Sequence, residues 1–158
     1  MKNYTNRHDK NYHAIRLSSI HELDKIASYV LAINWSRRRA QTAASQGLIQ
    51  MDCVAACYVN GELWIASNSQ ELTSADIEAL QAELGDVIVY IVTNGTPQVM
   101  HAEMQLLSQL IQENVSTAGM YMGVSKPCCD YCRHELNKAG INYTQYHTAN
   151  VKNWESPW

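Results

Sequence analysis

Two short segments, His101-Ala102-Glu103 and Pro127-Cys128-Cys129-Asp130-Tyr131-Cys132, decide how this sequence folds and what it can bind. One imidazole and two thiolates form a ligand set that suits zinc. Three protein ligands leave the fourth tetrahedral position for water, which is typical of a catalytic site rather than a structural one. The glutamate two residues after the histidine is then placed to move protons for that water.

The two segments also mark the starts of two expected helices. The loop 93–97 precedes the first helix, and the loop 125–127 precedes the second. Free N–H groups and the positive end of the helix dipole favour a thiolate over a thiol at such a position. The cysteine run can be read as Cys129 with Cys132 or as Cys128 with Cys132, because both spacings bring two sulfurs to one side of a helix. We favour Cys129 as the ligand, and Cys128 stays open as the alternative.

Hydrophobic periodicity predicts helices and strands that alternate along the chain. The expected helices are 18–31, 35–46, 73–85, 100–113 and 129–139, and the expected strands are 53–58, 63–66, 87–92, 120–124 and 141–146. Asn60-Gly61, between the first two strands, is the strongest short hairpin signal. The β-branched run 87–92 is expected as a buried central strand. This alternation predicts an α/β fold, a three-layer α/β/α sandwich with a central mixed sheet and an N-terminal hairpin.

Length and composition fit one domain with a single core. The chain has 158 residues, 46% hydrophobic and 17% charged, with a net charge of −3. We expect a polar arm over 1–14 and one domain over 15–158.

The net charge excludes a strongly basic surface that binds nucleic acid over its whole extent, but not a local basic groove. No stretch approaches the roughly 20 apolar residues of a membrane span, and residues 1–10 lack the apolar core of a signal peptide. Three of the five cysteines lie within 128–132, which predicts metal binding in a reducing compartment.

The pattern His-x-Glu, followed by Pro-Cys-x-x-Cys, is the signature of zinc deaminases. Through these residues the chain resembles the cytidine-deaminase-like superfamily. The resemblance implies that superfamily's α/β/α fold and a Zn²⁺ cofactor held by His101, Cys129 and Cys132. It also implies that Glu103 carries protons from water to a ring nitrogen and to departing ammonia. The segment 73–92 departs from the simplest order of elements: either it is an insertion, or the hairpin is assigned one strand too early.

Candidate substrate contacts come partly from the resemblance and partly from the residues themselves. The resemblance implies that Asn68 contacts the sugar and that backbone groups of Ala102 and Ser125 meet the base; a plain turn asparagine is the alternative for Asn68. Independently, Trp35 and Arg37-Arg38-Arg39 form a candidate nucleic-acid platform, in which the indole stacks on a base and the guanidinium groups contact phosphates. The alternative for this arginine run is a solvated helix face.

The stretch Ser125-Lys126-Pro127-Cys128-Cys129 makes the chain most like the bacterial toxin-type nucleic-acid deaminases. That resemblance implies conversion of cytosine to uracil in single-stranded nucleic acid, with DNA favoured over RNA, and an immunity protein as a further partner. It implies a cytoplasmic site of action for a secreted toxin domain without its own signal peptide. The alternatives are a free cytidine or nucleotide deaminase of salvage metabolism, a structural zinc site with His134 or Cys128 as fourth ligand, and a catalytically inactive zinc module that binds nucleic acid or a partner protein.

Overall fold

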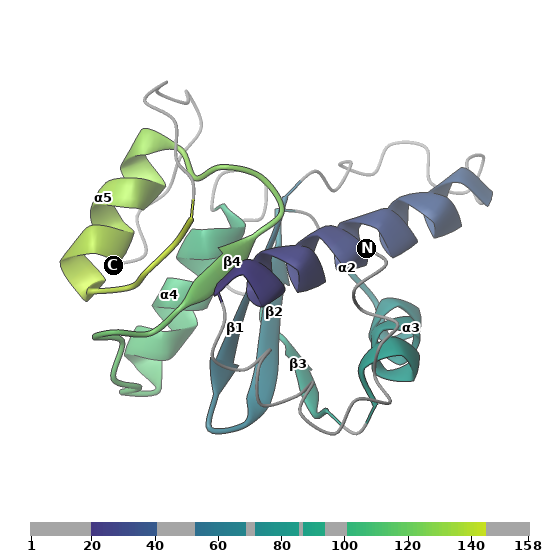
Figure 1. The fold of residues 1–158 in the computed structure, drawn as a ribbon, viewed down its shortest axis with the longest axis horizontal. Coiled ribbons are helices and arrows are strands. Elements are labelled where there is room, and N and C mark those ends of the chain that lie inside the picture. The colour runs from purple at the N-terminus through teal and green to yellow at the C-terminus, as the bar shows by residue number, and fades with distance from the viewer. Residues whose placement is uncertain (1–19, 41–52, 69–71, 86, 94–100, 145–158) are drawn as a thin grey trace.

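The computed structural model describes residues 20–40, 53–68, 72–85, 87–93 and 101–144. Its elements, in chain order, are α2 (Ile20–Ala40), β1 (Val54–Val59), β2 (Glu62–Ser67), α3 (Ser74–Leu84), β3 (Val89–Ile91), α4 (Ala102–Gln112), β4 (Met122–Val124) and α5 (Asp130–Ala139). Within these residues the strands form one sheet in the order β3-β2-β1-β4 (Figure 1). The sheet is mixed, because β1 runs antiparallel to both β2 and β4 while β3 runs parallel to β2.

The hairpin of β1 and β2 is confirmed, and its turn explains its register. Asn60 and Gly61 both have positive φ angles, 50° and 83°, which is the backbone that a two-residue hairpin turn needs. The turn pairs Val59 with Glu62, and the same register places Val54 opposite Ser67. The start of β1 and the end of β2 therefore lie together at one end of the sheet.

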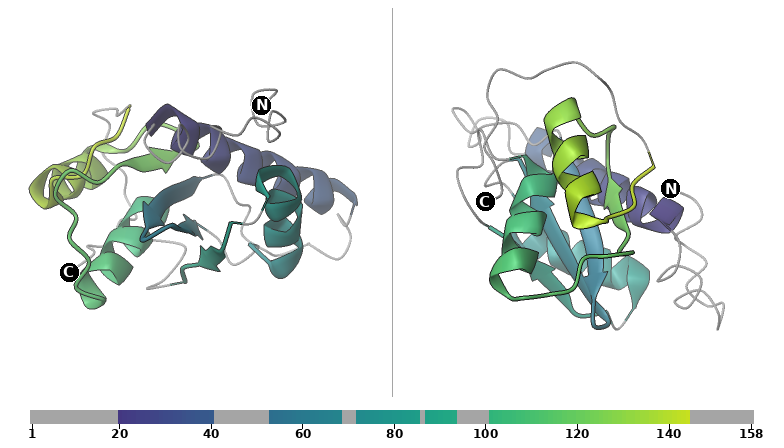
Figure 2. Two further views of the ribbon diagram at one scale, coloured as in Figure 1. Left: turned by 60° about the horizontal axis from the view of Figure 1, so that its bottom comes forward. Right: turned by 90° about the vertical axis from the view of Figure 1, so that its left-hand side faces the viewer.

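Alternate side chains of the strands face two separate helical layers, and the predicted three-layer α/β/α sandwich is confirmed (Figure 2). One face of β1 and β2 packs with α4 and α5, through buried residues that include Cys57 and Trp64. The other face packs with α2 and α3, through buried residues that include Val54 and Leu63. Such alternation follows from the two-residue repeat of a strand whose two faces are both buried.

The helix α2 lies unusually close to β4, because position 123 is a glycine. A Cβ atom at Gly123 would lie only 2.1 Å from the backbone carbonyl carbon of Leu23. Two hydrogen bonds fix the same contact, since Asp24 Oδ1 accepts from the Val124 N–H at 2.8 Å and Asp24 Oδ2 accepts from the Thr144 hydroxyl at 2.5 Å. The helix α2 thereby fixes the position of β4, the strand that precedes the cysteine segment.

The predicted break between two N-terminal helices is wrong. One helix, α2, runs through the segment where separate helices at 18–31 and 35–46 were expected, and residues 41–52 lie outside the described part of the chain. Asn34, in the predicted break, is buried, and its Nδ2 donates a hydrogen bond to Asp76 Oδ2 at 3.2 Å. This hydrogen bond to α3 stabilises the buried polar side chain of Asn34 within α2.

The prediction of a central strand at 87–92 is also wrong, because β3 lies at the edge of the sheet as described. Ile88 and Tyr90 leave 63% and 47% of their surface exposed, which a central strand would bury. β3 lies on the outer side of β2, and β1 lies between β2 and β4. The hairpin of β1 and β2 was therefore correctly assigned. The segment with α3 and β3 is an addition at the outer edge.

The predicted C-terminal strand at 141–146 is only partly described. Within residues 141–144 it is reduced to a parallel bridge between Tyr121 and Asn142, closed by hydrogen bonds from the Met122 N–H to the Asn142 carbonyl and from the Asn142 N–H to the Met120 carbonyl. This bridge places the end of the described chain beside β4. The expected arm at 1–14 lies outside the described residues, and none of the described helices is long and apolar enough to span a membrane.

Candidate metal centre

Two helix N-termini bring the candidate metal ligands together. His101 is the N-cap of α4 and has an extended backbone with φ −62° and ψ 157°, while its carbonyl accepts from Met104 and Gln105. Cys129 is the N-cap of α5, and its sulfur accepts a hydrogen bond from the Cys132 N–H at 3.4 Å. Each ligand therefore lies where free N–H groups and the helix dipole favour negative charge.

The separations between the three side chains fit a tetrahedral zinc site. The His101 Nδ1 atom lies 3.6 Å from Cys129 Sγ and 3.4 Å from Cys132 Sγ. In a tetrahedral site with a Zn–N distance of about 2.0 Å and a Zn–S distance of about 2.3 Å, nitrogen and sulfur lie about 3.5 Å apart. Within the described residues these are the three side chains whose ligand atoms cluster closely enough for one ion. The donor set and its spacing thus suit zinc.

The ionisation of the Cys129 thiol also favours metal binding. Hydrogen bonds to the Cys129 sulfur, from Cys132 first and then from His101, hold the pKa of this thiol far below its ordinary value. The same contact with Cys129 raises the pKa of the His101 imidazole above its usual range. Thiolate is the form that ligates zinc, so the electrostatics of the group prepare Cys129 for that role.

Glu103 lies in the first turn of α4 and is almost completely buried, with 2% of its surface exposed. Burial raises the pKa of its carboxyl group, and His101 and Cys129 are close enough for their charges to act on it. Its Oε1 atom accepts a hydrogen bond from the Cys53 thiol at 3.6 Å. Glu103 is therefore a carboxyl group beside the candidate ligands and outside their group.

Cys128 differs from its neighbour Cys129 in both position and environment. It is fully buried and is not part of the three-ligand group that the described residues form. Its thiol contacts the Glu103 carboxyl, and burial is the main reason why its pKa is raised. The geometry favours Cys129 as the partner of Cys132, as we expected, although the choice of metal ligand remains a prediction.

The other candidate for a fourth protein ligand, His134, points to solvent. The His134 side chain is 60% exposed, and its Nε2 atom lies 3.5 Å from Asp130 Oδ2 on the same helix. Asp130 also accepts from the Arg133 guanidinium at 2.7 Å. These contacts make His134 a surface residue of α5, and the described residues offer three ligands rather than four.

The predicted substrate contacts lie at the end of the sheet where β1 begins. Asn68 Oδ1 accepts from the Cys53 N–H at 3.1 Å, and Ser125 Oγ accepts from the Val54 N–H at 2.8 Å. Ala102 is the first residue of α4 and is buried. The structure therefore places all three near the helix termini that carry His101 and Cys129. Their roles in substrate binding stay predictions.

The predicted nucleic-acid platform lies elsewhere in the fold. Trp35 and Arg37-Arg38-Arg39 belong to the last turns of α2, and their side chains lie outside the described part. In Figures 1 and 2 that end of α2 and the helix α5 lie on opposite sides of the molecule.

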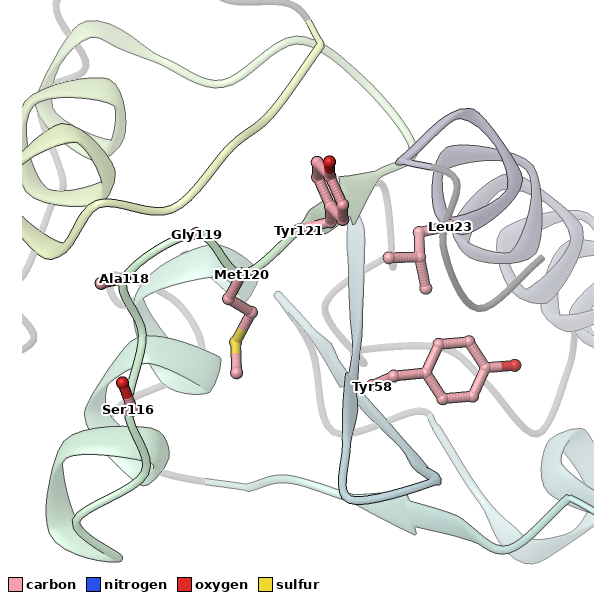
Figure 3. Close-up of a pocket in the computed structure, with 7 residues that line it drawn as sticks. All are labelled: Leu23, Tyr58, Ser116, Ala118, Gly119, Met120 and Tyr121. Carbon is pink, nitrogen blue, oxygen red and sulfur yellow. The ribbon is translucent and has the colours of Figure 1, made fainter. Parts of the chain in front are cut away.

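A separate cavity lies at the opposite end of the sheet (Figure 3). It has a volume of about 310 Å³ and is lined by Leu23, Tyr58, Ser116, Ala118, Gly119, Met120 and Tyr121. Because β1 and β4 pair antiparallel, with Cys57 opposite Met122 and Ala55 opposite Val124, Tyr58 and Tyr121 lie at the sheet end away from Val54 and Ser125. None of these described lining residues is a histidine, cysteine or carboxylate, so this cavity is not a second metal site.

Sequence reasoning missed the role of Cys53, which it placed only at the start of the expected strand 53–58. The residue is buried, its thiol contacts the candidate base Glu103, and its backbone contacts Asn68. The signal available in the sequence was its place immediately before β1, which is where the hairpin register brings it level with Asn68. The contact with Glu103 spans 50 positions and has no local signature.

The fold and this group of side chains define a class of protein: an α/β/α sandwich with three candidate metal ligands beside a buried carboxyl group. Residues 100–158 match the family model described as OTT_1508_deam-like deaminase, and they contain His101, Glu103, Cys129 and Cys132. This match confirms the resemblance to the cytidine-deaminase-like superfamily, and it supports a deaminase activity. Comparison with curated proteins found no match, and neither did comparison with solved structures.

Proposed function

We propose that this chain is a zinc-dependent hydrolytic deaminase that converts cytosine to uracil in single-stranded nucleic acid, DNA rather than RNA. One observation carries the proposal: a buried glutamate lies at the start of the helix whose N-cap histidine meets two cysteines of a second helix. The deaminase family match over residues 100–158 supports the same reaction.

The reaction requires a proton carrier beside the three ligands. Zinc, when held by His101, Cys129 and Cys132, supplies Lewis-acid activation of water near neutral pH. The Glu103 carboxylate accepts a proton from the attacking water and gives it to a ring nitrogen of cytosine. The carboxylate then takes the remaining proton of the added hydroxyl group and gives it to the amine, the C–N bond breaks and a C=O bond forms, so that one water is consumed and one ammonia is released. A glutamate that ligated the metal could not perform these transfers.

The chain's other polar groups would position the substrate. In this proposal the Asn68 side chain binds the sugar, and backbone groups of Ala102 and Ser125 bind the base. The hydrogen bonds that Asn68 and Ser125 make with the start of β1 hold them at one sheet end, which supports this arrangement. A fixed geometry matters because a reacting group displaced by about 1 Å can lose roughly a hundredfold in rate.

The nucleic-acid substrate and the toxin role are the finer parts of the proposal. Their support is the Ser125–Cys129 stretch, together with the aromatic and cationic residues Trp35 and Arg37-Arg38-Arg39. Single-stranded substrate is the simpler case, because no base has to be drawn out of a duplex. If the chain acts as a toxin-type domain in the cytoplasm of a target cell, an immunity protein is its expected partner.

A substrate panel tests this proposal. The zinc-loaded protein is incubated with single-stranded DNA, duplex DNA, RNA and free cytidine, and conversion of cytosine to uracil is quantified in each. We expect the single-stranded oligonucleotide to react fastest, with a rate that falls as salt rises. Rapid turnover of free cytidine that ignores salt would instead favour a salvage deaminase, which the net charge of −3 would suit.

A further inference from the structure

Cys53 joins two parts of the candidate site that lie on different elements. It precedes β1 and is 6% exposed. Its Sγ atom lies 3.6 Å from Glu103 Oε1 on α4. Its backbone N–H donates to Asn68 Oδ1 at 3.1 Å, and its carbonyl accepts from the Asn68 N–H at 3.2 Å. One residue therefore contacts the candidate base through its side chain and the candidate sugar ligand through its backbone.

A second thiol meets the same carboxyl group. Cys128 is completely buried, and its thiol is close enough to the Glu103 carboxyl group for each to affect the other's pKa. The terminal torsion of a glutamate is broad and roughly two-fold, so that the carboxyl group rotates unless neighbours hold it. Thiols are weak donors, but a buried pair in contact with one carboxyl group restricts its rotation without adding charge.

We propose that Cys53 is a positioning residue of the site, whose thiol fixes the orientation of the Glu103 carboxyl group while its backbone fixes the Asn68 side chain. This inference rests on the proposed function, because it takes Glu103 as the proton carrier. The two contacts are separable by mutation, since a side-chain substitution removes the thiol and leaves the backbone bonds to Asn68. Cys53→Ala should then impair the proton transfer without weakening binding of the substrate.

Cys57 provides a matched control for the thiol. It lies four positions after Cys53, within β1, it belongs to the same core cluster, and it is fully buried. Burial alone accounts for the rise of its pKa to about 12. At about 3.3 Å per residue along a strand, its Cα lies roughly 13 Å from that of Cys53. Cys57→Ala thus removes a buried thiol of the same size without touching Glu103.

The kinetic test compares four proteins at equal zinc content on a single-stranded DNA oligonucleotide that carries one cytosine. For Cys53→Ala we expect kcat to fall about 10-fold with KM changed less than about 2-fold, as for the removal of one hydrogen bond used in the transition state. Cys53→Ser, which keeps a donor, should recover most of kcat, and Cys57→Ala should resemble the wild type. Equal effects of Cys53→Ala and Cys57→Ala would overturn the inference, as would a change confined to KM.

A stability measurement keeps the inference testable without turnover. In a double-mutant cycle of Cys53→Ala with Glu103→Ala, the unfolding equilibrium constants should depart from multiplicative behaviour by about threefold or more, because residues in contact couple. The same cycle with Cys57→Ala should be multiplicative; multiplicative behaviour in both cycles would contradict the contact. The proposed function fails separately, namely if Glu103→Gln deaminates as fast as the wild type.

Discussion

Replacing Gly123 by alanine should destabilise the domain far more than its small size suggests. The added Cβ would lie 2.1 Å from the backbone carbonyl carbon of Leu23 and 2.4 Å from the backbone nitrogen of Asp24. Carbon atoms pack best at about 3.5 Å or more, so α2 would have to retreat from β4 by roughly 1.4 Å. No side-chain rotation can relieve a clash with backbone. We therefore expect a loss of stability near the upper end for overpacking, about 3 kcal/mol.

Urea and thermal unfolding of the wild type, Gly123→Ala and a control, Gly61→Ala, measure this loss. Gly61 has a φ of +83° and no atom within 4 Å of a built Cβ, so its substitution carries only the backbone strain of about 1–2 kcal/mol. The larger destabilisation at Gly123 should lower the melting temperature by about 6–12 °C. If Gly123→Ala costs no more than Gly61→Ala, then α2 does not press on β4 in the way we describe.

Two further predictions concern the metal and the nucleic acid. Cys129→Ser or Cys132→Ser should abolish stoichiometric zinc in elemental analysis, and a chelator should lower the stability of the wild type, because metal bound to the folded state stabilises it. Cys128→Ser should keep its zinc, and a zinc-free Cys128→Ser variant would reverse our choice of ligand. Replacing Arg37-Arg38-Arg39 with alanine should weaken deamination of single-stranded DNA and reduce its dependence on salt. The slope of the logarithm of the binding constant against the logarithm of the salt concentration should become shallower by about 0.7 for each phosphate that the protein no longer neutralises. An unchanged slope would show that these arginines do not contact the substrate.

The parts of the fold that the sequence could predict have local causes. The hairpin follows from the backbone freedom of Asn60-Gly61. The end of α5 follows from Gly140, which adopts the left-handed φ of 75° that closes a helix. The start of α3 follows from the Thr73 N–H, which donates to Asp76 Oδ2 at 3.1 Å. Each of these features depends on residues a few positions apart, and so a single sequence carries the information.

The errors concern contacts between distant segments. The sequence predicted two separate helices on either side of Asn34, but the helix is continuous there, and Asn34 donates a hydrogen bond to Asp76, 42 positions away. The run 87–92 is apolar enough for a central strand, but its place in the sheet depends on which neighbouring strand it pairs with. Its pairing with β2 at the sheet edge leaves Tyr90 beside Trp64, with ring centroids 5.5 Å apart. Local patterns do not encode such choices.

The candidate site also has one part that the sequence could predict and one part that it could not. The ligand group was predictable because Cys129 and Cys132 lie within one helical turn, and because His101 caps another helix of the same kind. The surroundings of Glu103 were not, since Cys53 and Cys128 reach it from two other parts of the chain. Motif spacing thus identifies the groups that bind metal, while the fold decides which side chains hold the base.

Cytosine deamination by two proteins at equal zinc content tests the central claim most directly. The zinc-loaded wild type and Glu103→Gln are incubated with the same single-stranded oligonucleotide, and uracil formation is followed together with zinc content. We predict that the wild type forms uracil and that Glu103→Gln, with its zinc retained, is slower by roughly 10²–10⁴-fold, the contribution of a general acid–base group. Equal rates for the two proteins would contradict the account, as would a zinc-loaded wild type that deaminates neither nucleic acid nor free cytidine.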